Sequence, residues 1–150
     1  MTQRDELFMR EALELAQQAE ANGEVPVGAV VVMDGDVVGR GFNSPIRLAD
    51  PTAHAEILAL REAARAVKNY RLESATMYAT LEPCVMCAGA LVAARVKRLV
   101  FGARDLRFGG VRSKFALADS ELLNHRVEVV EGALVVECVA LVKGFFERRR

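Results

Sequence analysis

The feature that most constrains this chain is Pro83-Cys84-Val85-Met86-Cys87, taken together with His54-Ala55-Glu56 further upstream. A Cys-x-x-Cys pair brings two thiolates within reach of one ion, and His54 offers an imidazole nitrogen. This donor set suits Zn²⁺ better than a hard cation. Three protein ligands leave the fourth tetrahedral position for water, as in catalytic zinc sites, and Glu56 is placed to handle that water's proton. The sequence therefore predicts one Zn²⁺ per chain, held by His54, Cys84 and Cys87.

Two other interpretations of the cysteine pair stay open at this point. A redox dithiol would need no His-x-Glu partner, and a structural zinc site would need a fourth ligand. His125 and Cys138 are the remaining ligand candidates, and neither has the spacing of a zinc finger. Cys138 lies in an apolar helical pattern, where a small buried residue is the expected role. The order of the two motifs therefore favours a catalytic metal.

Composition indicates a folded chain without a membrane segment. With 150 residues, of which 52% are hydrophobic, the chain is long enough for one packed domain, expected over residues 1–150. No apolar run reaches the ~18 residues of a membrane span. The polar, acidic N-terminus is unlike a signal peptide. Only Cys138 lies outside the predicted metal site, so no disulfide framework is expected. These features predict a cytoplasmic protein.

Hydrophobic periodicity predicts a chain of alternating helices and strands. Helices are expected over residues 2–21, 53–67 and 84–96 and from about residue 133, and strands over 27–33, 36–42, 75–81, 98–103 and 127–130. The Asp34-Gly35 dipeptide predicts a hairpin turn between the first two strands. Strand-helix-strand units follow in the middle of the chain. The predicted fold class is therefore α/β, a three-layer α/β/α arrangement in which a five-stranded mixed sheet has helices on both faces.

Both parts of the predicted metal site are expected at helix starts. Thr52 is predicted as the N-cap of the second helix, which places His54 and Glu56 in its first turn. Pro83 fits the first position of the third helix, so Cys84 and Cys87 would share one face of its first turn. Two helix N-termini would then converge on the metal, where their N–H groups and dipoles favour negative charge.

Charge is balanced overall but unevenly distributed along the chain. The formal net charge is zero, yet the stretch 95–114 contains Asp105 as its only acid and seven basic residues: Arg95, Lys97, Arg98, Arg104, Arg107, Arg112 and Lys114. Part of this stretch lies in a loop-rich insert, 104–119, that is too long for a simple connection. An anion-binding face and an ordinary solvated surface are both consistent with this distribution.

Two further expectations concern helix surfaces. The segment 88–94 has almost no polar side chains, which predicts a helix that is either central or covered by a second copy of the chain. In the second case Leu91 and Val92 would lie at least partly in the interface. The final Arg148-Arg149-Arg150 is expected to be a charged, frayed end.

With these motifs the chain resembles the bacterial tRNA-specific adenosine deaminases of the cytidine deaminase superfamily. His-x-Glu followed by Pro-Cys-x-x-Cys is the signature of zinc-dependent nucleobase deaminases. Similarity to the tRNA-specific branch extends over the segments 24–30, 50–56, 69–72, 80–90 and 101–105. Tyr70-Arg71-Leu72 and Gly102-Ala103-Arg104-Asp105 resemble that branch in particular. Arg112 departs from its pattern, because relatives tend to have glycine there.

The resemblance implies a cytidine deaminase-like fold and a homodimer that converts adenosine to inosine at the wobble position of a tRNA anticodon. In that reaction a zinc-activated hydroxide attacks C6 of adenine while Glu56 moves the protons. The partner would be the anticodon stem-loop, with Asn43 contacting the target base. The candidate substrate-binding residues are Asn43, Val27, Ala53, Asp105, Arg107 and Lys114.

Two alternative functions remain on sequence grounds. The same fold could deaminate a free base or nucleoside, such as guanine or cytosine. A zinc-stabilised interaction domain without catalysis is the alternative from another class. Activity on an anticodon stem-loop, but not on free adenosine or guanine, would separate the two enzymes.

Overall fold

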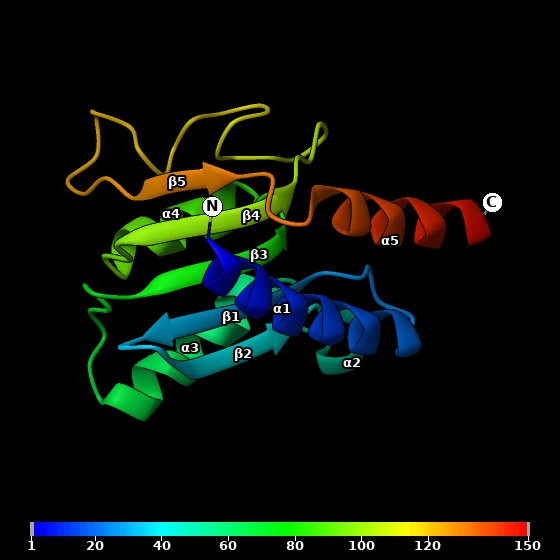
Figure 1. Cartoon of the computed structure of the whole chain (residues 1–150), viewed down its shortest axis with the longest axis horizontal. Coiled ribbons are helices and arrows are strands. Elements are labelled where there is room, and N and C mark those ends of the chain that lie inside the picture. The colour runs from blue at the N-terminus through cyan, green and yellow to red at the C-terminus, as the bar shows by residue number, and fades with distance from the viewer. Residues whose placement is uncertain (1, 150) are drawn as a thin grey trace.

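A computed structural model describes residues 2–149 of the chain (Figure 1). The helices are α1 (Gln3–Ala21), α2 (Pro45–Leu48), α3 (Ala55–Val67), α4 (Val85–Ala93) and α5 (Val135–Arg148). The strands are β1 (Gly28–Met33), β2 (Asp36–Phe42), β3 (Thr76–Leu81), β4 (Arg98–Ala103) and β5 (Glu128–Glu131). Within these residues no helix combines the length and the apolar character needed to cross a membrane.

The strands form one five-stranded mixed sheet, as predicted, in the order β2-β1-β3-β4-β5. β1 pairs antiparallel with both β2 and β3, whereas β3, β4 and β5 run parallel to one another. Parallel neighbours need a crossover connection, and α4 makes the one between β3 and β4. The carboxyl end of β3 therefore leads directly into the predicted cysteine motif.

Helices cover both faces of the sheet, because successive side chains of each central strand enter different cores. In β1, Ala29 and Val31 belong to a core shared with α3 and α4, whereas Val30 and Val32 belong to a core shared with α1 and the start of α5. β3 and β4 divide their side chains in the same way. The predicted three-layer α/β/α arrangement is thus confirmed, and Figure 1 shows α5 extending beyond the carboxyl ends of β4 and β5.

Two glycines of β2 let α3 lie unusually close to the sheet. A Cβ at Gly39 would lie 2.2 Å from the carbonyl oxygen of Ala59, and one at Gly41 would lie 2.3 Å from that of Ala55. Neither distance is possible between non-bonded atoms, so larger residues would push the helix away. Because α3 begins beside the predicted metal ligands, this close packing fixes their distance from the sheet.

The two helices of the metal motifs begin later than predicted. α3 begins at Ala55 with His54 as its N-cap, so Thr52 is not the N-cap. The reason is local: the Asp50 carboxylate accepts hydrogen bonds from the Thr52 N–H and hydroxyl, which makes a separate turn before the helix. α4 begins at Val85 with Cys84 as its N-cap, so the prediction of Pro83 as the first helical residue is also wrong.

Other differences involve contacts between distant segments. The four-residue helix α2 was not predicted; the buried Glu24 carboxylate holds its first turn by accepting from the N–H groups of Ile46 and Arg47. The prediction of a frayed C-terminus is wrong for the two described arginines. Arg148 pairs with Glu20 of α1, and Arg149 donates to the carbonyl of Gly23. Arg150 lies outside the described residues.

Candidate metal centre and active site

The structure brings the three predicted metal ligands together. The ligating atoms of His54, Cys84 and Cys87 all lie within 4.8 Å of one another. His54 Nδ1 is 3.5 Å from Cys84 Sγ and 3.6 Å from Cys87 Sγ, so the imidazole presents that nitrogen to both sulfurs. Neither His125 nor Cys138 joins this group. His125 bonds the carbonyl of Val96, and Cys138 is buried in the core under α1. The donor set thus has three protein ligands, as a catalytic site requires.

Two helix starts position these ligands, as the sequence indicated. His54 and Cys84 are the N-cap residues of α3 and α4 and have extended backbones, with ψ of 152° and 179°. An extended N-cap residue carries its side chain in front of the helix end, so both side chains reach the same space. Cys87, in the first turn of α4, is fully buried and faces them. Two positive helix ends therefore surround a site that gathers anionic ligands.

The protonation behaviour of the cysteines fits a divalent cation. The neighbouring Cys87, together with His54, lowers the pKa of the Cys84 thiol to about 4. Cys84 in turn raises the pKa of Cys87 well above its usual range, and burial adds to that effect. Two thiolates so close together repel each other, and a divalent cation between them removes that repulsion. With an imidazole as third donor, the arrangement fits Zn²⁺.

Glu56 lies beside the ligands in the first turn of α3 and is only 4% exposed. Burial raises the pKa of its carboxyl to about 7. A carboxyl with that pKa both accepts and releases a proton near neutral pH, which is the property required of a general acid–base group. The site thus combines a metal-binding donor set with a buried proton carrier.

Known protein families contain the same combination. Residues 2–103 match the zinc-binding region of cytidine and deoxycytidylate deaminases, and this segment contains all three ligands and Glu56. The chain belongs to this family. Zinc is the metal of the family's site, and the His/Cys/Cys group of this deaminase is positioned for it.

Individual relatives of the chain come from several branches of the deaminase family. A tRNA-specific adenosine deaminase of Haemophilus influenzae is 53% identical over 147 residues, which cover 97% of this chain and 85% of the relative. A solved structure from a study of A-to-I editing by tRNA:A34 deaminases at the wobble position superposes with a TM-score of 0.86 at 42% identity, covering 89% of this chain and 97% of that one. The guanine deaminase of Nitrosomonas europaea gives a TM-score of 0.80 at 27% identity, covering 93% and 83%.

Three of the predicted substrate-binding residues lie together at the start of α3. The Asn43 side-chain oxygen accepts the N–H of Ala55 at 2.9 Å, and the Asn43 N–H donates to the carbonyl of Val27. Ala53 is fully buried, and its carbonyl accepts from Ser44, the neighbour of Asn43. These bonds connect the end of β2 to the residue before His54. No group among residues 2–149 accepts a hydrogen bond from the Asn43 amide N–H₂, which is therefore available to a ligand.

The remaining predicted residues lie in the insert, which is attached directly to the cysteine motif. Gly109 forms an antiparallel bridge with Cys84, and the Gly110 N–H donates to the Pro83 carbonyl at 2.8 Å. The Asp105 carboxylate accepts from the backbone of the next turn, whereas Arg107 and Lys114 are exposed. The insert is therefore a wall of the site, not a distant loop.

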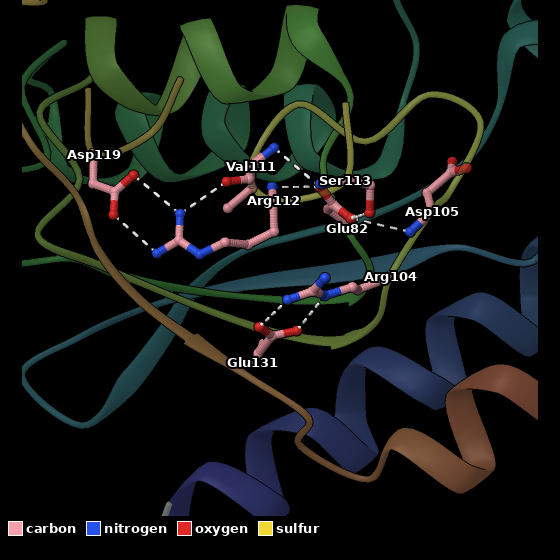
Figure 2. A network of polar contacts seen from close by, with 8 residues as sticks. All are labelled: Glu82, Arg104, Asp105, Val111, Arg112, Ser113, Asp119 and Glu131. Atoms are coloured by element: carbon pink, nitrogen blue, oxygen red, sulfur yellow. Dashed lines mark hydrogen bonds and ion pairs between the residues drawn. The ribbon is translucent and has the colours of Figure 1, made fainter. Parts of the chain in front are cut away.

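Glu82 organises the insert and was not singled out from the sequence. Its buried carboxylate accepts hydrogen bonds from the backbone N–H groups of Asp105, Val111, Arg112 and Ser113 and from the Ser113 hydroxyl (Figure 2). Burial raises the pKa of Glu82, but these bonds outweigh it and lower the pKa overall. The sequence signal was an acid at the end of a buried strand, where a charge needs several donors.

The basic character of the insert is weaker than its sequence suggested. Arg104 makes a bidentate ion pair with Glu131, and Arg112 makes one with Asp119 (Figure 2). Arg98, in the same basic stretch, pairs with Asp5 of α1. The side chains of Arg104 and Arg112 are therefore already paired with carboxylates in this structure. The acids that neutralise these arginines lie outside the stretch 95–114. The charge balance of that stretch alone therefore did not include them.

The expected interface residues of α4 are also corrected. Leu91 is fully buried and Val92 is 6% exposed, both in this chain's own core against α3 and the sheet. Neither is available to a second copy. The exposed residues of α4 are Val85, Gly89 and Ala93, one helical turn apart on the opposite face.

Proposed function

We propose that this chain is a zinc-dependent deaminase that converts adenosine to inosine at the wobble position of a tRNA anticodon. The observation that carries the proposal is the buried Glu56 beside the His54, Cys84 and Cys87 donor set. Its support is the high identity to tRNA-specific adenosine deaminases over almost the whole chain. We further propose that residues 1–150 act as one catalytic domain, and that the chain works in the cytoplasm.

Each site residue receives a role in the reaction. His54, Cys84 and Cys87 hold the zinc ion, which when bound makes a water molecule acidic enough to act as nucleophile near neutral pH. Glu56 takes a proton from the water that attacks C6 of adenine. It gives that proton to ring N1, and then moves the remaining proton of the hydroxyl added at C6 to the exocyclic amine, so that the C6–N bond breaks as the C6=O bond forms and ammonia leaves. Burial raises the pKa of the Glu56 carboxyl above its usual range, which favours its holding a proton between the two transfers.

Recognition of the base falls to the residues at the start of α3. The Asn43 amide N–H₂ donates to a ring nitrogen of adenine, while its oxygen stays bonded to Ala55. Val27 and Ala53 are almost completely buried, so they shape the wall behind Asn43 without offering polar groups.

Recognition of the RNA falls to the insert. Asp105 fixes the turn that presents Arg107, and Arg107 and Lys114 contact the phosphate backbone. A single-stranded loop has to open so that one base reaches a buried carboxylate, and contacts on the wall of the site hold that open form.

A homodimer is part of the proposal, with its interface moved from Leu91 and Val92 to the opposite face of α4. Val85 is 47% exposed, and a Cβ at Gly89 would meet nothing within 4 Å. Small residues on an exposed helix face allow a second copy to approach closely. Sedimentation should give twice the chain mass for the wild type and a monomer for Gly89→Lys. A monomeric wild type would refute this part.

The decisive experiment compares substrates. The zinc-loaded protein should release ammonia from an anticodon stem-loop with adenosine at the wobble position, and not from free adenosine or guanine. Glu56→Gln should keep zinc and bind the stem-loop but lose ~10²–10⁴-fold in turnover. Turnover of free guanine with no action on the stem-loop would favour the free-base alternative, for which the 27% identical guanine deaminase is the supporting observation.

A further inference from the structure

The insert carries two exposed phenylalanines that the proposed reaction does not use. Phe108 is 65% exposed and Phe115 is 57% exposed. Single exposed apolar side chains are common on protein surfaces. These two are unusual because they occur with two exposed cations, Arg107 and Lys114, in one short loop. The Arg107 guanidinium lies 5.9 Å from the centre of the Phe108 ring.

Backbone hydrogen bonds bring the backbone of Phe115 next to the residue that follows Phe108. The carbonyl of Gly109, the residue after Phe108, accepts from the N–H groups of both Lys114 and Phe115, at 2.9 and 3.4 Å. The same Gly109 is bridged to the metal-ligand residue Cys84. Both rings are therefore attached to the one piece of backbone that borders the metal centre.

This piece of backbone is held firmly although its side chains are exposed. Glu82 fixes the loop from inside, as Figure 2 shows, and the Arg112–Asp119 ion pair closes it. Gly109 and Gly110 leave no space: a Cβ on Gly109 would lie 2.4 Å from the Glu82 carboxylate, and one on Gly110 would lie 2.8 Å from the Val85 nitrogen. A rigid loop loses little conformational entropy when its exposed side chains bind a partner.

We propose that Phe108 and Phe115 form a stacking surface for unpaired bases next to the deaminated nucleotide, with Arg107 and Lys114 on the adjoining phosphates. An aromatic ring beside a cation is the combination by which proteins hold single-stranded nucleic acid, because every base has a face that stacks. Among the described residues neither Arg107 nor Lys114 makes an ion pair, so both charges are available. The inference rests on the proposed function and adds how the protein holds the anticodon loop of the RNA open.

The test uses the zinc-loaded protein and an anticodon stem-loop that carries 2-aminopurine beside the wobble position. Phe108→Ala and Phe115→Ala should each weaken binding about 5- to 150-fold, the range expected for loss of one stacked base. Both should also reduce the quenching of 2-aminopurine fluorescence that stacking causes. The salt dependence of binding should stay that of the wild type, because no cation is removed.

Matched variants separate stacking from other effects. Tyrosine in place of Phe108 or Phe115 should keep the binding and quenching that the alanine variants lose. Leucine at either position keeps an apolar side chain but should lose both. Leu122→Ala is the control, because Leu122 is 94% exposed and its N–H donates to the Ser120 hydroxyl instead of to Gly109, and this variant should bind like the wild type. Zinc content verifies that each variant keeps its metal centre.

Three results would overturn the inference. Wild-type affinity in both alanine variants would show that the rings do not contact the RNA. Wild-type affinity in the leucine variants would show that apolar contact, not stacking, is involved. A change from dimer to monomer with unchanged RNA affinity would assign the rings to the contact with a second copy. A wild-type protein that does not bind the stem-loop would instead refute the proposed function itself.

Discussion

Replacing Glu82 with glutamine should release the insert while leaving the metal ligands in place. Oε2 of Glu82 accepts the N–H groups of Val111, Arg112 and Ser113 at 3.1, 2.7 and 2.9 Å. Oε1 accepts the Asp105 N–H at 3.1 Å and the Ser113 hydroxyl at 2.5 Å. Glutamine offers one oxygen and one N–H₂ group, so it can satisfy only one of these two sets of donors.

The expected free-energy cost follows from these contacts. If the glutamine oxygen occupies the Oε2 position, its N–H₂ group faces the Ser113 hydroxyl and the Asp105 N–H. The hydroxyl can rotate to accept, but the backbone N–H cannot, and such an unpaired donor costs about 1–3 kcal/mol. Loss of the charge also weakens the other three bonds, each by up to ~1 kcal/mol. Because only Val111 among these donors is fully buried, water compensates part of the loss, and we expect about 2–4 kcal/mol.

The insert should open locally and not unfold the whole protein, since Val111 and Ala118 are the only fully buried residues that the insert adds to the core under α3. Hydrogen exchange at the amides of residues 111–113 should therefore be roughly 30- to 1,000-fold faster in Glu82→Gln. Zinc content should stay at the wild-type level, and stem-loop binding should weaken. Glu147→Gln is the matched control, because Glu147 is exposed on α5 and makes no ion pair among the described residues. Wild-type exchange at residues 111–113 in Glu82→Gln would refute this explanation of the loop.

Three further predictions concern the metal, the base contact and the fold. Metal analysis of Cys87→Ala should show depleted zinc, and stoichiometric zinc there would mean that the ligand set is wrong. Asn43→Ala should lower both turnover and thermal stability, because it removes the bond to the Ala55 N–H as well as the base contact; a change in turnover alone would exclude that structural role. The Arg98 guanidinium holds the pKa of Asp5 well below its usual range. Ionised Asp5 therefore stabilises the fold above the unfolded-state pKa of ~3.9. The stability difference between wild type and Asp5→Asn should be full near pH 7 and shrink as the pH falls below about 4; a difference independent of pH would contradict it.

The arrangement of layers could be predicted because it depends on local patterns. A valine-rich run such as 27–33 is recognisable as a buried strand, and strand-helix-strand units restrict the topology. The metal centre could be predicted for a similar reason. Cys84 and Cys87 are close in the chain, and His54 forms a recognisable motif with Glu56.

Contacts between distant segments could not be predicted from the same patterns. Whether Arg112 is free depends on Asp119, and whether Arg104 is free depends on Glu131 in another strand. The predicted start of α3 was wrong for a different reason. Both Thr52 and His54 precede the apolar pattern of α3, and only the bond of Thr52 to Asp50 decides that the helix begins after His54.

The location of His54 and Cys84 at N-cap positions has a consequence for how this protein tolerates substitution. In most helices the N-cap side chain bonds a free N–H group of the first turn, but neither of these side chains does so. Serine or aspartate at either position would make that bond and stabilise the metal-free chain by about 0.5–2 kcal/mol, while destroying the donor set. A screen for the thermal stability of the metal-free chain would therefore select inactive proteins at these two positions. Selection for a more stable metal-free fold would therefore first remove the zinc ligands at the N-caps of α3 and α4.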